Sequence, residues 1–181
     1  MVRLSPTSLV AFTRNRTGGP ILRSESSDDG RTWNRARGTP LPSNNSSIAA
    51  LRLPNNELLV CFNNASDRRR FPLTAALSND NGLTFYWARD LVSSADVGNI
   101  ERDNSRNQRN NNNNNNNRNR NPGGKQSYPA LALAKDNDSV HVLWTDNRRA
   151  IRFATLSLDW FSGGDGFSEG EFRNRETKTN P

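Results

Sequence analysis

The sequence lacks the features that mark membrane-spanning and disulfide-stabilised proteins. Its 181 residues contain no apolar run of about 18 residues, so no membrane span is expected. No apolar stretch of signal-peptide length follows Met1. The lone cysteine, Cys61, excludes an internal disulfide and stands among apolar residues, which predicts a small buried side chain. The one histidine, His141, alternates with valines, which predicts a half-exposed strand residue.

A basic excess is present, but it is unevenly distributed along the chain. The formal net charge is +7, and residues 101–125 alone contribute +4, from six Lys and Arg against two acidic residues. A nucleic-acid-binding protein is expected to place basic residues beside aromatic ones. The basic segment contains no aromatic residue, so no nucleic-acid partner is predicted.

One segment has the composition of a disordered loop. Residues 99–124 are rich in Asn and Arg, and eight consecutive Asn occupy positions 110–117. Such a segment has almost no apolar side chain to offset the entropy cost of ordering the chain. We therefore expect an unstructured insertion over 99–124 between folded segments 1–98 and 125–161, followed by a flexible tail over 162–181.

Outside this insertion the sequence repeats a strand pattern. Residues 4–12, 53–62 and 133–144 each read as an apolar strand, a polar turn and a second apolar strand. Another short apolar strand follows each hairpin, over 21–24, 73–77 and 151–155. Repeats of about 40–50 residues with four short strands each are typical of propeller blades. The pattern therefore predicts an all-β protein.

Two of the repeats end in the same turn motif. Residues 26–33 and 78–85 both fit Ser-x-Asp-x-Gly-x-Thr-aromatic, and their first residues are 52 positions apart. The Asp side chain can accept backbone N–H groups within the turn, and Gly adopts positive φ at little cost. We expect structural roles for Asp28 and Asp80, and packing between strands for Trp33 and Phe85.

The turn motif resembles the Asp box of the BNR-repeat family, which includes the sialidases. Two further segments resemble conserved sequence segments of this family: residues 70–78, which lead into the second box, and Ser127-Tyr128-Pro129-Ala130. The resemblance covers residues 2–92 and 125–157. It implies about three blades of a six-bladed β-propeller of the sialidase type, from the C-terminal part of a longer protein.

The resemblance also implies a site for a carboxylated sugar. Sialidases bind the sugar carboxylate with three converging arginines, because guanidinium pairs bidentately and stays charged. Arg14, with Arg16 as a near alternative, matches one of these arginines, and Arg70 matches another. Arg148 and Arg149 stand where the family has basic residues. The alternative for each of them is a solvated residue at a strand end or turn.

The candidate nucleophile departs from the family pattern. Sialidases use a Tyr nucleophile assisted by a Glu, with an Asp as the acid–base from an early blade that this sequence does not contain. Here Gln126 stands at the place of the Tyr, Tyr128 follows two positions later, and Arg3 is near the place of the Glu. Tyr128 is therefore the candidate catalytic residue only if the strand register shifts. Its alternative role is an aromatic of the core or the site wall.

Two functions follow from these observations. The first is a sialidase-like exo-glycosidase domain acting on sialylated or related acidic glycans, with no cofactor and no metal. The second is a non-catalytic BNR-repeat propeller that binds glycans or proteins. Gln126 and Arg3 favour the second function, whereas Arg14, Arg70 and the two boxes support the first. An acidic glycan is the expected ligand, and the sequence does not predict an oligomeric state.

Overall fold

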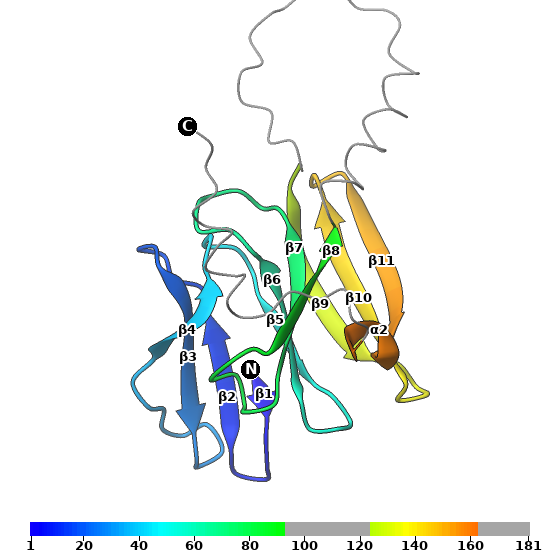
Figure 1. Cartoon of the computed structure of the whole chain (residues 1–181). Coiled ribbons are helices and arrows are strands. Elements are labelled where there is room, and N and C mark those ends of the chain that lie inside the picture. The colour runs from blue at the N-terminus through cyan, green and yellow to red at the C-terminus, as the bar shows by residue number, and fades with distance from the viewer. Residues whose placement is uncertain (93–123, 163–181) are drawn as a thin grey trace, which may run out of the picture.

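The computed structural model describes residues 1–92 and 124–162 as three antiparallel sheets (Figure 1). The first sheet has the order β1 (Val2–Arg3), β2 (Leu9–Thr13), β3 (Pro20–Ser26) and β4 (Arg37–Pro42). The second has the order β5 (Ala49–Arg52), β6 (Leu58–Asn63), β7 (Leu73–Ser78) and β8 (Trp87–Val92). The third contains β9 (Gln126–Leu133), β10 (Ser139–Asp146) and β11 (Ala150–Ser157). The predicted all-β fold is confirmed.

The sheets are arranged side by side as propeller blades are. Within each sheet, strands that follow one another in the chain are neighbours. The first strand of each sheet contacts the first strand of the next, since β1 contacts β5 and β5 contacts β9. This places the first strands along one inner line, with later strands further out, as in blades around a propeller axis. The three described sheets do not close into a ring (Figure 1).

The third sheet differs from the expected four strands. Its described residues form three strands, and the chain continues after β11 into the short helix α2 (Leu158–Ser162). No turn motif of the Ser-x-Asp-x-Gly-x-Thr type follows β11. Instead Ser157 caps the helix by accepting a hydrogen bond from the Trp160 amide, and the Trp160 and Phe161 rings pack edge-on against Trp87 of β8. Most of the predicted insertion 99–124 and of the predicted tail lies outside the described residues.

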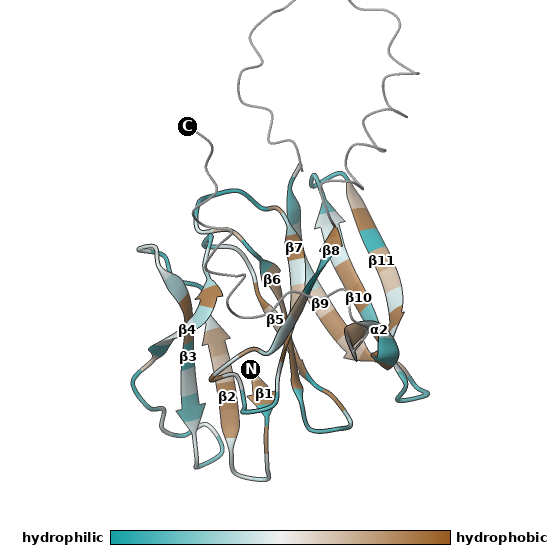
Figure 2. Cartoon of the chain, viewed as in Figure 1, coloured by the Kyte–Doolittle hydropathy of each residue, from teal (hydrophilic) through white to brown (hydrophobic). Residues whose placement is uncertain are grey.

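Apolar side chains between neighbouring sheets form the core. Figure 2 shows hydrophobic residues concentrated on the strands and hydrophilic residues on the connecting loops. One cluster joins Ile21 and Leu41 of the first sheet to Val60 and Phe62 of the second. A second cluster joins the second sheet to the third and to α2. Cys61 is fully buried, as predicted, and burial raises the pKa of its thiol.

The two turn motifs share one hydrogen-bond pattern. The Asp28 carboxylate accepts hydrogen bonds from the Ser26 hydroxyl (2.8 Å), the Thr32 amide (2.9 Å) and the Thr32 hydroxyl (2.6 Å). Asp80 accepts the corresponding bonds from Ser78 and Thr84 at the same three distances. Each aspartate therefore closes its own turn between the third and fourth strands of a sheet, which is the structural role predicted for it.

These bonds also stabilise the charged form of each aspartate. The Thr32 hydroxyl and amide, together with the Ser26 hydroxyl, lower the pKa of Asp28 to about 2. Burial raises the pKa of Asp80, but the bonds from Thr84 and Ser78 outweigh it and hold that pKa below its ordinary value. Neither carboxylate is therefore suited to hold a proton for general acid catalysis near neutral pH.

The aromatic residues that end the two motifs differ in burial. Phe85 is completely buried between the first and second sheets, as predicted. Trp33 keeps 39% of its surface exposed, so the prediction of a buried ring is wrong at this position. The physical reason is the neighbouring sheet: in the described part of the chain, no sheet precedes the first one to cover Trp33. Its indole N–H donates to the Gly30 carbonyl (3.1 Å).

Candidate functional site

Tyr128 lies on a β-bulge at the start of β9. In the pairing of β9 with β10, Ala130 faces Leu143 and Ser127 faces Thr145, so Tyr128 and Pro129 together stand opposite Trp144. Tyr128 has a φ of 55°, in the left-handed region that a bulky residue rarely adopts. Its side chain is 52% exposed. A bulge with one strained residue redirects a side chain away from the regular alternation of the strand.

The bulge interrupts the regular alternation of β9 at Tyr128. Residues on opposite sides of the bulge follow different alternations, so the strand pattern alone does not fix the side-chain direction of Tyr128. Pro129 is the signal in the sequence, because a proline inside a strand is confined to edges, strand starts and bulges. The bulge was not predicted from the sequence.

Gln126, at the position of the expected nucleophile, is a buried structural residue. Its side-chain amide donates to the Asp146 carboxylate (2.9 Å), and its side-chain oxygen accepts from the Trp144 indole N–H (2.8 Å). Its backbone oxygen accepts a hydrogen bond from the Asn63 side chain (2.9 Å). Gln126 is only 3% exposed. These three bonds fix the strand two residues before Tyr128.

The buried carboxylate of this network is compensated by a cation. Asp146 is 8% exposed at the end of β10. Its Oδ2 atom forms an ion pair with the guanidinium of Arg152 on β11, at an N–O distance of 3.0 Å. Asn147 donates to the same oxygen as Gln126 (2.9 Å). Asp146 is thus paired with structural partners, as buried carboxylates require.

Arg70 is hydrogen-bonded to β9, the strand that carries Tyr128. It lies in the loop between β6 and β7, and its guanidinium donates to the Ser127 hydroxyl (3.1 Å). Its Cζ atom lies 5.4 Å from the centre of the Tyr128 ring. The backbone N–H of Gln126 also donates to the backbone carbonyl of Arg70 (2.8 Å). The second and third sheets are therefore joined at this point, and Arg70 faces Tyr128. Ser127 was not identified from the sequence.

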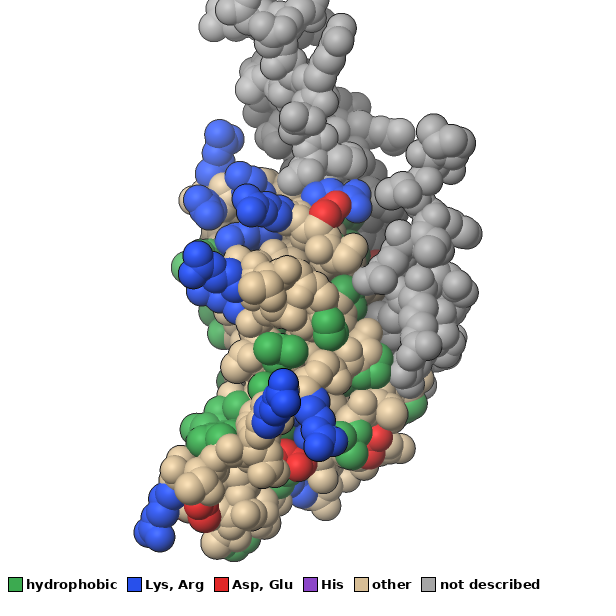
Figure 3. Space-filling model, turned by 90° about the vertical axis from the view of Figure 1, so that its left-hand side faces the viewer, with side chains coloured by type: hydrophobic (Ala, Val, Ile, Leu, Met, Phe, Trp, Pro, Cys, Tyr) green, Lys and Arg blue, Asp and Glu red, His purple; other side chains and the backbone are tan. Residues whose placement is uncertain are grey.

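Further arginines surround the tyrosine. Arg148 and Arg149 form the turn between β10 and β11, and with Tyr128 and Thr145 they line a cavity of about 370 Å³. Arg14 follows β2 directly, whereas Arg16 lies exposed in the loop beyond it. Figure 3 shows Lys and Arg side chains gathered at the upper end of the molecule.

The arginines change the acidity of the tyrosine hydroxyl. A hydrogen bond with Arg70 and its positive charge, with smaller contributions from the charges of Arg148 and Arg14, lower the pKa of Tyr128 below its usual value of 10. The structure therefore brings Arg14, Arg70 and Arg148 into one electrostatic environment. Arg16 is exposed in the loop after β2, and Arg149 lines the cavity beside Arg148.

Arg3 lies away from the tyrosine, in contact with the first turn motif. Arg3, near the place of the assisting Glu, is exposed and pairs with Asp29 of the first turn motif (2.6 Å). The described residues hold no group of three or more His, Cys, Asp or Glu side chains that could bind a metal ion. Within the same residues, no helix has the length and apolar character needed to cross a membrane.

We expect the two tyrosines to titrate separately. Tyr128 should ionise below pH 10, because nearby guanidinium charges stabilise the phenolate. Burial and the Glu57 carboxylate raise the pKa of Tyr86 to about 12. Absorbance at the phenolate band should show a first step that Tyr128→Phe removes and Arg70→Gln moves upward. A first step that persists in Tyr128→Phe would contradict this assignment.

Comparisons with known proteins agree with the architecture. The family model described as "BNR repeat-like domain" matches residues 1–142. Among solved structures, the Hadza microbial sialidase Hz136 is similar, with a TM-score of 0.62 and 19% identity over 88% of this chain. The match covers 27% of that sialidase, so the chain spans about a quarter of its length. No curated protein matches the sequence. The family match spans most of the chain, and the protein belongs to the BNR repeat-like family.

Proposed function

We propose that this chain carries part of the substrate site of a sialidase-like exo-glycosidase acting on sialylated or related acidic glycans. The observation that supports it most is the grouping of Arg70 and Arg148 beside Tyr128, with a further charge effect from Arg14. Like charges repel, so such a grouping is unfavourable without an anion to compensate it. A sugar carboxylate matches the planar, bidentate geometry of guanidinium.

Within this proposal, Tyr128 is the nucleophile and the arginines have two tasks. Arg70 and Arg148 bind the carboxylate and also stabilise the phenolate, which is the nucleophilic form of the tyrosine. Tyr128 lines the same cavity as Arg148 and Arg149, which would bring the sugar next to the nucleophile. The two turn motifs are Asp boxes with a structural role, since each aspartate is saturated by its own turn.

A non-catalytic BNR-repeat propeller that binds glycans is the second candidate. It is favoured by Gln126, whose amide cannot act as a nucleophile and is held by Trp144 and Asp146. Arg3 near the place of the assisting Glu supports the same candidate. Both candidates share the acidic-glycan ligand and differ in whether Tyr128 reacts with it.

The ligand test is a titration with N-acetylneuraminic acid. We expect saturable binding, and about 10- to 100-fold weaker binding for Arg70→Gln, the cost of losing hydrogen bonds to a charged group. Arg70→Lys should fall between the two, because lysine keeps the charge and loses the bidentate geometry. The matched control is Arg16→Gln, which removes an exposed charge from the loop after β2 and should bind as the parent does.

Two further comparisons separate the outcomes. The methyl ester of the sugar lacks the carboxylate charge and should not bind, so equal binding of acid and ester would overturn the carboxylate site. Release of the sugar from an aryl sialoside distinguishes the two candidates. Release that Tyr128→Phe abolishes, with binding retained, supports the glycosidase, whereas release that Tyr128→Phe leaves unchanged would overturn the role of Tyr128 as the nucleophile.

A further inference from the structure

A second concentration of positive charge lies between the first sheet and the turn motif of the second sheet. A pocket of about 480 Å³ opens there, lined by parts of β3 and β4 and by Gly82 and Leu83 of the turn. Its charged lining residues are three arginines, Arg23, Arg35 and Arg37, and one glutamate, Glu25. Glu25 pairs with Arg23 and balances one of these positive charges.

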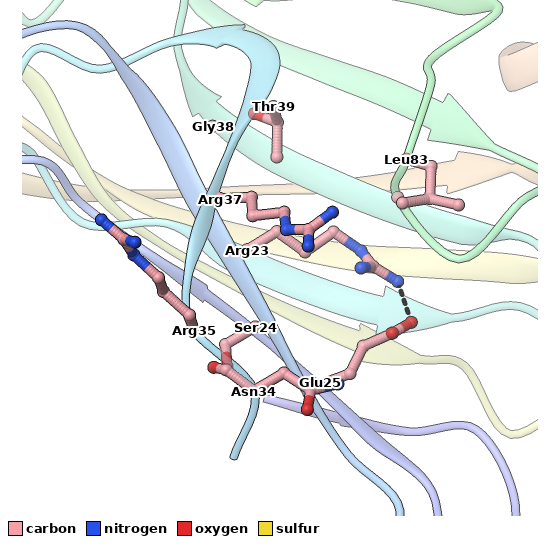
Figure 4. Close-up of a pocket in the computed structure, with 10 residues that line it drawn as sticks. Arg23, Ser24, Glu25, Asn34, Arg35, Arg37, Gly38, Thr39 and Leu83 are labelled. Atoms are coloured by element: carbon pink, nitrogen blue, oxygen red, sulfur yellow. Dashed lines mark hydrogen bonds and ion pairs between the residues drawn. The ribbon is translucent and has the colours of Figure 1, made fainter.

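Two of these arginines face each other across neighbouring strands. Arg23 of β3 and Arg37 of β4 are direct partners in the antiparallel pairing. Like charges directly opposite in a sheet are destabilising, so this pair carries an energetic cost without an anion. Figure 4 shows the Arg23 and Arg37 side chains extending in the same direction, whereas Arg35 points the other way.

The two facing arginines differ in how firmly they are held. Arg23 is only 8% exposed, and its Nε atom donates to the Asn81 carbonyl of the second sheet's turn (2.8 Å). Its Nη2 atom pairs with Glu25 (Figure 4). Among the described residues, the Arg37 side chain has no hydrogen bond or ion pair. The pocket thus combines a fixed, buried guanidinium with a second one that is free to bind.

We propose that this pocket binds a tetrahedral oxyanion, namely a phosphate monoester or the free phosphate or sulfate ion. Such an anion presents oxygens in several directions and can accept hydrogen bonds from two guanidinium groups on adjacent strands at once, whereas the two oxygens of a carboxylate lie in one plane. Guanidinium groups form paired N–H···O bonds with phosphate oxygens, and Arg23 and Arg37 can approach one anion from adjacent strands. The proposal does not depend on the Tyr128 site, because the two sites share no residue.

Binding at this pocket would also connect two blades. Arg23 already joins β3 to the turn of the second sheet through Asn81. The neighbouring Gly82 has a φ of 83°, and a Cβ atom there would collide with the Phe12 ring, so the turn has no room to move toward the first sheet. An anion between Arg23 and Arg37 would therefore lie beside a turn whose position is fixed.

The experiment is a titration of the whole chain with inorganic phosphate and with sulfate at constant ionic strength. It is performed in an Arg70→Gln background, so that failure of the Tyr128 site and failure of this pocket remain distinguishable. We expect saturable NMR shifts of the Gly38 and Gly82 amides, which line the pocket. Arg37→Gln should weaken binding about 10-fold or more. The control Arg31→Gln, at an exposed arginine of the first turn motif, should not.

A sugar monophosphate distinguishes a bound ester from a free ion. Tighter binding of the sugar phosphate than of inorganic phosphate assigns the pocket to phosphorylated sugars, and equal binding assigns it to the ion itself. Because Arg37 is exposed, its replacement is expected to leave the fold intact, which thermal unfolding checks. Shifts that do not saturate, or that are the same in Arg37→Gln and Arg31→Gln, would overturn the proposal.

Discussion

Replacing Phe85 with alanine should lower the free energy of unfolding by about 3–5 kcal/mol, the range found for large aromatic truncations in protein cores. Phe85 has no exposed surface and lies in a cluster with Ile21 and Leu41 of the first sheet and Phe62 of the second. Its removal therefore opens a cavity between two sheets, which cannot collapse without moving both. Chemical denaturation of the whole chain measures the change.

The matched control is Trp33→Ala at the corresponding position of the first turn motif. Trp33 is 39% exposed, and its indole makes one hydrogen bond, to Gly30. We expect a loss below about 2 kcal/mol, since little apolar surface is removed from a packed environment. Equal losses of unfolding free energy for the two variants would mean that Trp33 and Phe85 are packed equally well. Trp33 would then be covered by residues outside the described part of the chain.

The contrast between Phe85 and Trp33 shows how much of the fold the sequence predicts. Period-two apolar strands and the repeated turn motif specify the individual sheets, because both are local features. Burial of the aromatic residue depends on the neighbouring sheet, which a local motif does not contain. The third sheet shows the same limit, since within the described residues the chain after β11 forms α2, whose Trp160 and Phe161 rings pack against Trp87.

The residues of the candidate site stay predictions. The sequence indicates Arg14 and Arg70 because they stand at fixed distances from recognisable strands, and in the structure the charges of both lower the pKa of Tyr128. The direction of Tyr128 was not predicted, because it depends on a bulge that the pairing with β10 creates. Gln126 was recognised only as a departure from the family pattern. Its structural role depends on Trp144 and Asp146, about 20 residues away.

Replacing Gln126 with methionine should destabilise the protein and also change the titration of Tyr128. Methionine is close to glutamine in length and fills the site, so packing is largely kept and the two side-chain hydrogen bonds are lost. The partly buried Trp144 indole N–H then loses its acceptor, and Asp146 loses one of its donors. An unsatisfied polar group costs about 1–3 kcal/mol, and Asp146 keeps Asn147 and Arg152 as partners, so we expect a loss of about 1–3 kcal/mol.

The titration separates a positioning role from a merely structural one. Gln126 anchors the strand two residues before the strained Tyr128, so its loss should let the bulge relax and carry the phenol away from Arg70. The first step of the tyrosine titration should then rise toward the ordinary value of 10. The control is Thr145→Val, which removes one hydrogen bond to the Ser127 carbonyl and leaves the Gln126 contacts in place. The contrary outcome is a Gln126→Met protein that is destabilised but whose Tyr128 titrates as in the parent. The hydrogen bonds of Gln126 would then stabilise the sheet without positioning Tyr128 beside Arg70.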